Sequence, residues 1–193
     1  MPKLETMALP VNRITQEDFI AIKLLIKESA ALPDPIKCKK GRQIGFDWIY
    51  NFESTKVLEA RNNPRIIRAF CSKTISIDAH SKFLYSYSQI PRIDFMLVDI
   101  DSISLVGSVY LTLTSLGLEI GKYISNEAYL SAGVAKRSFQ SFRAYLNNYF
   151  PESTKIISKT RKDNLANIAL NSSIGFTSSG DLPGDFLLME ANL

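Results

Sequence analysis

The sequence predicts a single α/β domain, and two observations carry this prediction. First, the segment from Leu118 to Phe176 alternates strand and helix patterns, in the order strand, turn, helix, strand, helix. Second, 193 residues with 46% hydrophobic and 22% charged side chains suffice for one hydrophobic core. The same totals argue against several domains.

Composition excludes several classes of protein. No apolar run approaches the roughly 18 residues that cross a bilayer, and the first residues lack the pattern of a secretory signal, so we expect a cytoplasmic protein without a membrane partner. One histidine and two cysteines, Cys38 and Cys71, provide neither a metal-ligand pattern nor a disulfide framework. We therefore expect no metal and two free thiols.

The first predicted element is a helix that Thr15 caps, with Asp18 at its third position. One apolar stripe, which continues to about Ala31, contains Phe19, Ile22 and Ile26. We interpret residues 1–42 as a helical extension and residues 43–193 as the main domain. The sequence leaves open whether the extension packs on its own domain or on another subunit of a homodimer.

A basic cluster, Lys37 to Arg42, lies within this extension. It has no interleaved aromatic residues of the kind that stack on bases, so we expect no nucleic-acid partner. A solvated loop is its default interpretation, and attraction of an anionic ligand is the alternative.

The middle of the chain predicts strands and short helices. Alternating aromatic residues over 46–52 predict a core strand, and a helix from residue 54 or 55 to Arg61 ends before Asn63-Pro64, where a second helical stretch begins. Residues 93–98 and 106–114 predict two strands, which the turn over 99–102 joins into a hairpin.

The last third predicts the remaining elements. A strand over 118–124 leads into small residues at 129–135 and a helix from Gly133, whose core stripe is Phe139, Phe142, Leu146 and Tyr149. A strand over 155–160 precedes a helix that Asn164 caps and that stops at Gly175. A loop over 180–184 and a strand over 186–190 close the chain.

The turn at 129–135 has a second interpretation besides an ordinary connection. The first amides of a helix lack internal partners and lie at the positive end of its dipole, so small side chains there leave room for a pyrophosphate. Together with Asn164-Leu-Ala-Asn167 and Gly175-Phe176, the turn resembles motifs of the GNAT N-acyltransferase superfamily.

The resemblance implies a fold and a cofactor site. The fold is a mixed, mostly antiparallel sheet flanked by helices, which a bulge in the fourth strand opens into a V between the fourth and fifth strands. Acetyl-CoA would be the co-substrate, with Leu130 and Ser131 departing from the usual Arg or Gln and Gly. The implied cofactor-binding residues are Tyr123, Ile124, Ser125, Leu130, Ser131, Ala132, Gly133, Val134, Ala135, Asn164 and Asn167.

Two further segments, 58–66 and 75–83, resemble the branch of the superfamily that acetylates nucleotide-linked amino sugars. This resemblance implies that Arg61, Asn62 and Arg65 bind the acceptor, although a charge cluster at a helix end is the alternative. We therefore expect transfer of an acetyl group to the amine of such a sugar in a ternary complex. Alternatives are a protein N-terminal or small-amine acetyltransferase, and a degenerate module that only binds acyl-CoA.

Three residues are candidates for catalysis. Glu119 and His80 are alternative general bases, because a carboxylate beside the thioester directs water in the family and His80 has an ordinary pKa near 6.5. Asn171 occupies the position of the family's tyrosine acid; it can donate a hydrogen bond but cannot act as an acid. Tyr123 and Tyr129 are the sequence-based replacements for that tyrosine.

Overall fold

The computed structural model describes residues 14–151 and 153–193, and its centre is one eight-stranded sheet. The strands follow the order β1-β2-β3-β4-β5-β6-β8-β7. Their bounds are β1 Ile36–Lys37, β2 Gln43–Trp48, β3 Arg92–Asp99, β4 Ser104–Thr114, β5 Gly117–Ile124, β6 Lys155–Arg161, β7 Thr177–Leu182 and β8 Phe186–Asn192.

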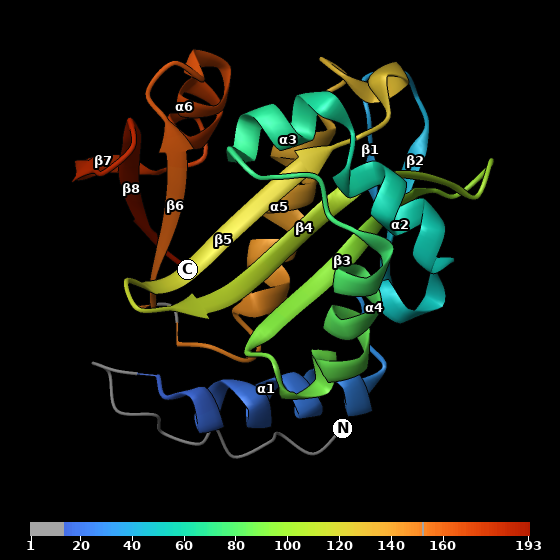
Figure 1. Ribbon diagram of the computed structural model, residues 1–193, viewed down its shortest axis with the longest axis horizontal. Coiled ribbons are helices and arrows are strands. Elements are labelled where there is room, and N and C mark those ends of the chain that lie inside the picture. The colour runs from blue at the N-terminus through green and yellow to red at the C-terminus, as the bar shows by residue number, and fades with distance from the viewer. Residues whose placement is uncertain (1–13, 152) are drawn as a thin grey trace.

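Helices cover both faces of this sheet. In Figure 1, α2, α3 and α4 lie in front of the strands, α5 lies behind them, and α1 runs along the lower end. The bounds are α1 Gln16–Ser29, α2 Ser54–Arg61, α3 Pro64–Phe70, α4 Ile77–Ser86, α5 Val134–Leu146 and α6 Leu165–Ser172. Short 3-10 turns are η1 Ile49–Asn51, η2 Tyr87–Gln89 and η3 Glu127–Tyr129. No described helix is long and apolar enough to cross a membrane.

The sheet opens between β5 and β6. These strands pair in parallel only at Leu118↔Ile156 and Glu119↔Ile157, whereas every other described pair of strands is antiparallel. Figure 1 shows them close together at one end and diverging toward α3 and α6. The mixed sheet and its V-shaped opening, which the resemblance implied, are confirmed.

The expected bulge in the strand over 118–124 is wrong. β5 pairs with β4 without a register shift, from Gly107↔Ile124 to Thr114↔Gly117. The V therefore arises because β6 turns away after two residue pairs. Since the ladder is regular, successive β5 side chains alternate between the front and back faces of the sheet.

The N-terminal helix packs on its own domain. Its Thr15 capping box forms as predicted, and Phe19, Ile22 and Ile26 belong to the main core with strands β2 to β5 and helix α5. Burial of such a stripe is the main stabilising term for an amphipathic helix. Of the two placements that the sequence left open, the structure shows the intramolecular one.

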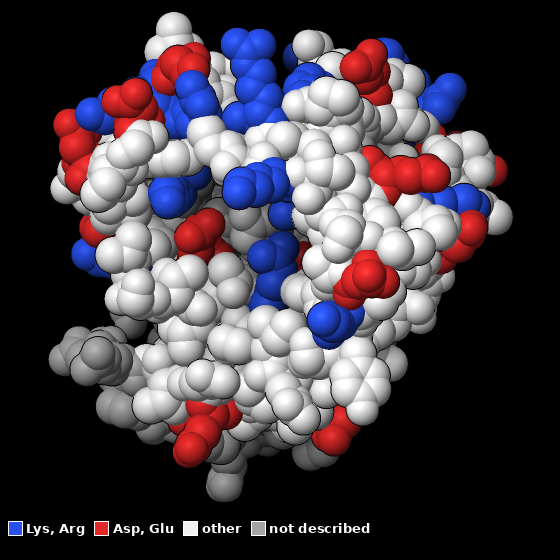
Figure 2. Space-filling model, in the orientation of Figure 1, with Lys and Arg blue, Asp and Glu red and all other residues white. Residues whose placement is uncertain are grey.

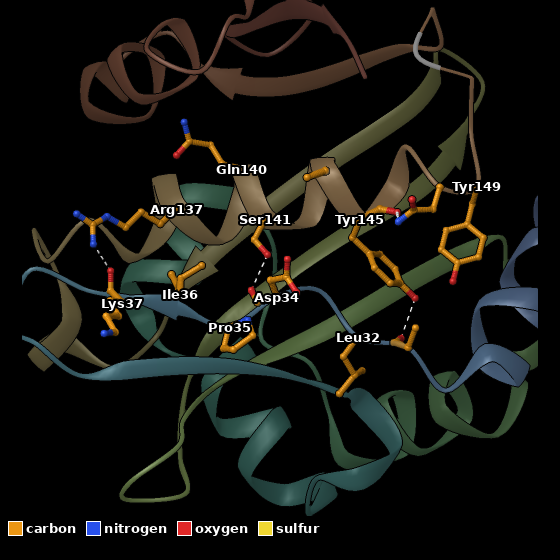
Figure 3. Close-up of a pocket in the computed structure, with 13 residues that line it drawn as sticks. Leu32, Asp34, Pro35, Ile36, Lys37, Arg137, Gln140, Ser141, Tyr145 and Tyr149 are labelled. Carbon is orange, nitrogen blue, oxygen red and sulfur yellow. Dashed lines mark hydrogen bonds between the residues drawn. The ribbon is translucent and has the colours of Figure 1, made fainter. Parts of the chain in front are cut away.

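The segment after α1 is fastened to the outer side of α5, as Figure 3 shows. Ser141 Oγ donates to the Asp34 carbonyl (2.6 Å), Tyr145 Oη donates to the Ala31 carbonyl (2.8 Å), and Arg137 donates to the Lys37 carbonyl. The fastened segment supplies the edge strand β1. The proposed boundary at residue 42 thus lies between two adjacent strands of one sheet.

Two local predictions need correction. The strand predicted over 46–52 ends at Trp48, because the Asp47 carboxylate accepts hydrogen bonds from Trp48 N and Asn51 Nδ2 and the chain turns into η1. The loop predicted over 180–184 is half strand, because β7 continues to Leu182 along β8. Its polar composition suits an exposed edge strand, where one side of the ladder faces solvent.

Candidate functional site

The opening between β5 and β6 holds a cleft of about 770 Å³. Figure 2 shows a hollow on this face of the molecule, with charged side chains around and inside it. Six basic side chains and one acidic side chain line the cleft: Lys39, Arg65, Lys122, Lys136, Lys159, Arg161 and Glu119. The excess of positive charge favours an anionic ligand.

One wall of the cleft is the turn that precedes α5. Ser131 (φ 58°) and Gly133 (φ 77°) both have left-handed backbones, and the helix begins at Val134. Among the described residues, the amides of 133–136 have no hydrogen-bond acceptor. Such a concave row of free N–H groups at a helix N-terminus is an anion-binding geometry.

The left-handed conformation at Ser131 explains why the family usually has glycine at this position. Glycine adopts positive φ without steric cost, whereas any other residue is strained there. Ser131 retains the required backbone at that cost. Leu130, Ser131, Gly133, Val134 and Ala135 all line the cleft, while Ala132 is buried behind the turn and gives its carbonyl to Lys39 N (2.9 Å).

The basic cluster at 37–42 supports this turn from behind. Lys40 Nζ donates to the Ala128 carbonyl (2.6 Å), and Arg42 Nη1 donates to Tyr129 Oη (2.7 Å). Tyr129 in turn donates to the buried Asp99 carboxylate, and this bond is the main reason that the pKa of Asp99 falls to about 2. The cluster is an exposed turn, as its default interpretation expected, and two of its side chains also hold the turn before α5 in place.

The opposite wall of the cleft, facing the turn, comes from β6 and α6. Asn164 caps α6 by accepting from Asn167 N, as predicted, and Asn167 Nδ2 donates to Thr160 Oγ1 (2.9 Å). Both asparagines line the cleft. At its mouth, Arg161 Nη1 donates to Cys71 Sγ (2.8 Å) at the end of α3. Cys71 and the buried Cys38 are both free thiols.

The predicted binding segment on β5 is only partly available. Tyr123 and Ile124 line the cleft, but Arg65 Nη2 already donates to the Ile124 carbonyl (2.6 Å). Ser125 does not line the cleft, because its amide donates to the Val106 carbonyl (3.0 Å) and its carbonyl accepts from Asn63 Nδ2 (3.4 Å). The three residues at 123–125 that the resemblance implied for the cofactor thus differ in their access to the cleft.

Glu119 lies on the front face of β5 and lines the cleft near its closed end. Burial raises the pKa of its carboxyl group, while the cations Lys159 and Arg92 oppose the rise. A carboxylate with a raised pKa that faces a cleft is suited to accept a proton near neutral pH. The structure places Glu119 at the cleft, and its role as a general base stays a prediction.

His80 lies elsewhere. It is buried in α4, 4% exposed, its ring stacks on Phe83, and it does not line the cleft. Burial lowers the pKa of its imidazole, and nearby Arg61 lowers it further. The structure therefore brings Glu119, but not His80, to the cleft wall.

The three residues implied for the acceptor also separate. Arg65 lines the cleft. The Arg61 guanidinium lies over the rings of Phe70 and Tyr123, with its carbon 5.2 and 5.3 Å from their centroids. Asn62 bonds the backbone of Ile75 through both its amide nitrogen and its carbonyl oxygen (2.8 Å each), which positions the start of α4.

Asn171 is fully buried and does not line the cleft. Its Nδ2 donates to Ser158 Oγ and Thr160 Oγ1 (3.1 Å each), so its Oδ1 faces Lys122, whose Nζ donates to it (2.7 Å). Lys122 lines the cleft, and burial lowers the pKa of its ammonium group to about 8. At the place where the sequence suggested Asn171, the polar side chain that lines the cleft is thus Lys122.

Sequence reasoning missed Lys39 and Lys122. Lys39 belongs to the basic cluster, so the interpretation as an anion-attracting segment would have found it. Lys122 lies within an apolar strand pattern at a position whose side chain faces α5 and α6, and a lysine at a buried strand position is itself an unusual feature. Among the described residues, no group of three or more possible ligands could hold a metal ion.

No family model matches the chain, and no curated protein sequence matches it. Solved structures do match. Spermidine N-acetyltransferase from Vibrio cholerae, in complex with CoA and spermine, is 16% identical with a TM-score of 0.64, over 77% of this chain and 95% of that one. An aminoglycoside acetyltransferase in complex with coenzyme A is 14% identical with a TM-score of 0.65, over 77% and 94%.

The GNAT domain of PAT from S. lividans is 11% identical with a TM-score of 0.66, and the match covers 83% of this chain and 97% of that domain. At these identities the likeness concerns the fold. The chain therefore has the GNAT fold, with its cleft at the opening between β5 and β6.

Proposed function

We propose that this protein is an acetyl-CoA-dependent N-acetyltransferase that acylates a primary amine. The observation that carries the proposal is one cleft lined by basic side chains, with free helix-terminal amides and a partly buried carboxylate, Glu119, in its walls. The matched acetyltransferases of the same fold support it, because one is in complex with CoA and spermine and another is in complex with coenzyme A.

The residues fit a pyrophosphate-bearing co-substrate. Residues 133–136 would hold the phosphates through backbone N–H groups, and Lys39 and Lys136 would supply the positive charge that Leu130 does not. The co-substrate supplies the activated acetyl thioester. The protein would position the amine next to the carbonyl carbon in a dry cleft. Much of the entropic cost of a bimolecular reaction is then met on binding, before the chemical step.

Glu119 would act as the general base. An amine must be uncharged to attack, so a carboxylate that accepts its proton, directly or through a water, raises the rate. Burial in the cleft raises the pKa of Glu119 toward that of a useful base. His80 is not among the residues that line this cleft, so we assign it to packing between α2 and α4.

For the acceptor we propose an anionic molecule with a primary amine, such as a nucleotide-linked amino sugar. Arg65 lines the cleft, and the described residues offer its guanidinium one acceptor, the Ile124 carbonyl, which leaves the buried Nε without one. Arginine suits a diphosphate, with which it forms paired hydrogen bonds. A polycation such as spermine would meet six basic side chains and only one acidic side chain.

Ligand-induced thermal stabilisation tests the co-substrate first. A ligand at about 100 times its Kd adds ~2.7 kcal/mol to the free energy of unfolding, which gives a clear rise in Tm. Ala135→Asp is the sharp variant, because a carboxylate in the first turn suits the helix dipole but repels a phosphate. We expect it to abolish the acetyl-CoA shift, which is measured against the Tm of the same variant without ligand.

Gln140→Glu is the matched control, since it adds negative charge on the exposed, outer side of the same helix (Figure 3). It should retain the shift. The acceptor is then found from CoA release with nucleotide-linked amino sugars, polyamines, aminoglycosides and peptides. Binding of acetyl-CoA without CoA release from any amine would favour the alternative of a degenerate acyl-CoA-binding module.

A further inference from the structure

We propose that Lys122 is the proton donor to the departing CoA sulfur, and that Asn171 positions it. This inference rests on the proposed acetyltransferase function. It replaces the tyrosine acid of the family with a lysine from a different element, the strand β5, and it gives Asn171 a supporting role.

The geometry places Lys122 at the required point. Its side chain leaves the back face of β5, three residues after Glu119 on a strand with regular alternation, and it lines the cleft. Asn171, on α6, lies directly behind it with Nζ to Oδ1 at 2.7 Å. The ammonium group therefore lies between the cleft and the side chain at the family's acid position.

Asn171 cannot rotate freely, because Ser158 and Thr160 of β6 hold its Nδ2. These bonds orient its carbonyl oxygen toward Lys122, and the bond from Lys122 Nζ to Asn171 Oδ1 connects the two sides of the V. An amide oxygen accepts one ammonium proton and leaves the other two free. No carboxylate lies within ion-pair distance of Lys122 Nζ among the described residues.

The other replacements suit this task less well. Tyr129 is 2% exposed and already donates its hydroxyl proton to Asp99. Tyr123 lies on the front face of β5, and burial raises its pKa to about 12. Burial lowers the pKa of Lys122 to about 8, close to the ordinary value of about 8.5 for a thiol. A donor and an acceptor of matched pKa exchange a proton readily.

The step balances as follows. The acceptor nitrogen forms a bond to the acetyl carbon, and the C–S bond breaks with its electron pair going to sulfur. One ammonium proton of Lys122 moves to that sulfur, which leaves a neutral lysine and a free CoA thiol. Glu119 receives the proton that the acceptor nitrogen loses, and exchange with water restores both side chains.

Steady-state kinetics of the full chain test the assignment. We expect Lys122→Met to lower kcat by about 10²-fold, with a much smaller change in the KM for acetyl-CoA. Lys122→Arg keeps the positive charge but has a pKa above 12, so it should also lose kcat. Lys155→Met is the matched control, because Lys155 is an exposed β6 residue outside the cleft, 63% exposed and paired with Glu190.

Two further measurements separate a proton donor from a structural residue. In the wild type, kcat should fall as pH rises through about 8, where Lys122 loses its proton, and this limb should be absent in Lys122→Met. Asn171→Asp sets a carboxylate against the ammonium group, so it should move the limb to higher pH. The ultraviolet absorbance of bound CoA should show a thiol pKa lowered by the wild type and by Lys122→Arg, but not by Lys122→Met.

The outcomes are distinct. If the wild type is active and Lys122→Met retains kcat within threefold with an unchanged pH profile, Lys122 is not the donor and the proposed function stands. If the wild type binds acetyl-CoA but releases CoA with no amine, the proposed function and this inference both fall. Loss of kcat in both lysine variants, with the expected shift in Asn171→Asp, supports the inference.

Discussion

The two faces of β5 each carry an ionisable side chain, and burial shifts the two pKa values in opposite directions. On the front face, Glu119 is an acid whose pKa burial raises; on the back face, Lys122 is a base whose pKa burial lowers to about 8. Both shifts have the same cause, because a cleft with little water disfavours either charge. The comparison teaches that desolvation along one strand shifts an acid and a base in opposite directions, the pKa of Glu119 upward and the pKa of Lys122 downward.

Removal of the front carboxylate should have the largest effect. Glu119→Gln keeps the size and the polarity of the side chain but cannot accept a proton, so we expect kcat to fall by about 10²- to 10⁴-fold. The acid limb of the pH profile, which the raised pKa places above the ordinary value of 4.5, should disappear. Stopped or steady-state assays of CoA release measure both.

Glu59→Gln on the exposed surface of α2 is the control for this substitution and should leave kcat unchanged. The Tm shift with acetyl-CoA should persist in Glu119→Gln, because Glu119 lies away from the phosphate end of the cleft. If Glu119→Gln kept a kcat within threefold of the wild type, Glu119 would not be the general base, and the comparison of the two faces would lose its front side.

Lys122 on the back face should affect the free energy of unfolding as well as the rate. A lysine whose folded pKa lies below its unfolded pKa favours the unfolded state when charged, so its cost is full below pH 8 and vanishes as pH rises past 10.5. Relative to Lys122→Met, the wild type should gain about 2 kcal/mol between pH 7 and pH 10. Urea denaturation at several pH values measures the difference.

This slope is independent of any acceptor. Because both proteins carry the same remaining titratable groups, their difference isolates Lys122. A flat difference across that range would mean that the ammonium group is well solvated, and the asymmetry between the faces would disappear. Lys155→Met, which removes an exposed lysine, should show no comparable slope.

The space on the front face should matter next. Tyr110 closes over Gly121, and a Cβ at Gly121 would lie 2.1 Å from the tyrosine ring. The Arg92 guanidinium stacks on the same ring at 3.9 Å, which limits its freedom to move. We expect Gly121→Ala to lower the free energy of unfolding by about 1–2 kcal/mol through overpacking.

A Tyr110→Leu background tests the cause. If the clash with the ring produces the loss, Gly121→Ala should cost less in that background, and a double-mutant cycle from denaturation data measures the coupling. Equal costs in both backgrounds would place the effect in the backbone of β5 instead.

The smallest effect belongs to the turn on the cofactor side. Ser131 has φ 58°, and Ser131→Gly should relieve a strain of about 1–2 kcal/mol while the unfolded chain gains about 0.5–1 kcal/mol of entropy. The expected net gain is about 0.5 kcal/mol, seen as a small rise in Tm. Ser131→Val should lower Tm instead, since a β-branched residue adopts this conformation poorly.

Much of the site could be predicted because it depends on local backbone. The turn over 129–135, the cap at Asn164 and the helix that follows each depend on residues that are neighbours in the chain, so their patterns are visible in the sequence. The strands at 93–98 and 106–114 and the capping box of Thr15 were predicted for the same reason. Glu119 became a candidate through the family resemblance, which gives a role to a carboxylate on the strand over 118–124.

The failures share one physical origin. Lys39 supports a turn about ninety residues further along the chain, and Lys122 meets Asn171 only because α6 packs behind β5. His80 suggested a base by its ordinary pKa, but packing between helices removed it from the cleft. In each case the deciding contact joins distant segments, and no local pattern records it.

The amino-acid sequence by itself thus determined the order of strands and helices, the free amides before α5 and the absence of histidine or cysteine clusters. Those features follow from side-chain size, alternation and backbone freedom within short windows. Only the tertiary structure decided which charged groups lose water, because desolvation depends on what packs around a side chain. Glu119 and Lys122 lose water because the fold places both of them in the cleft where β5 and β6 part.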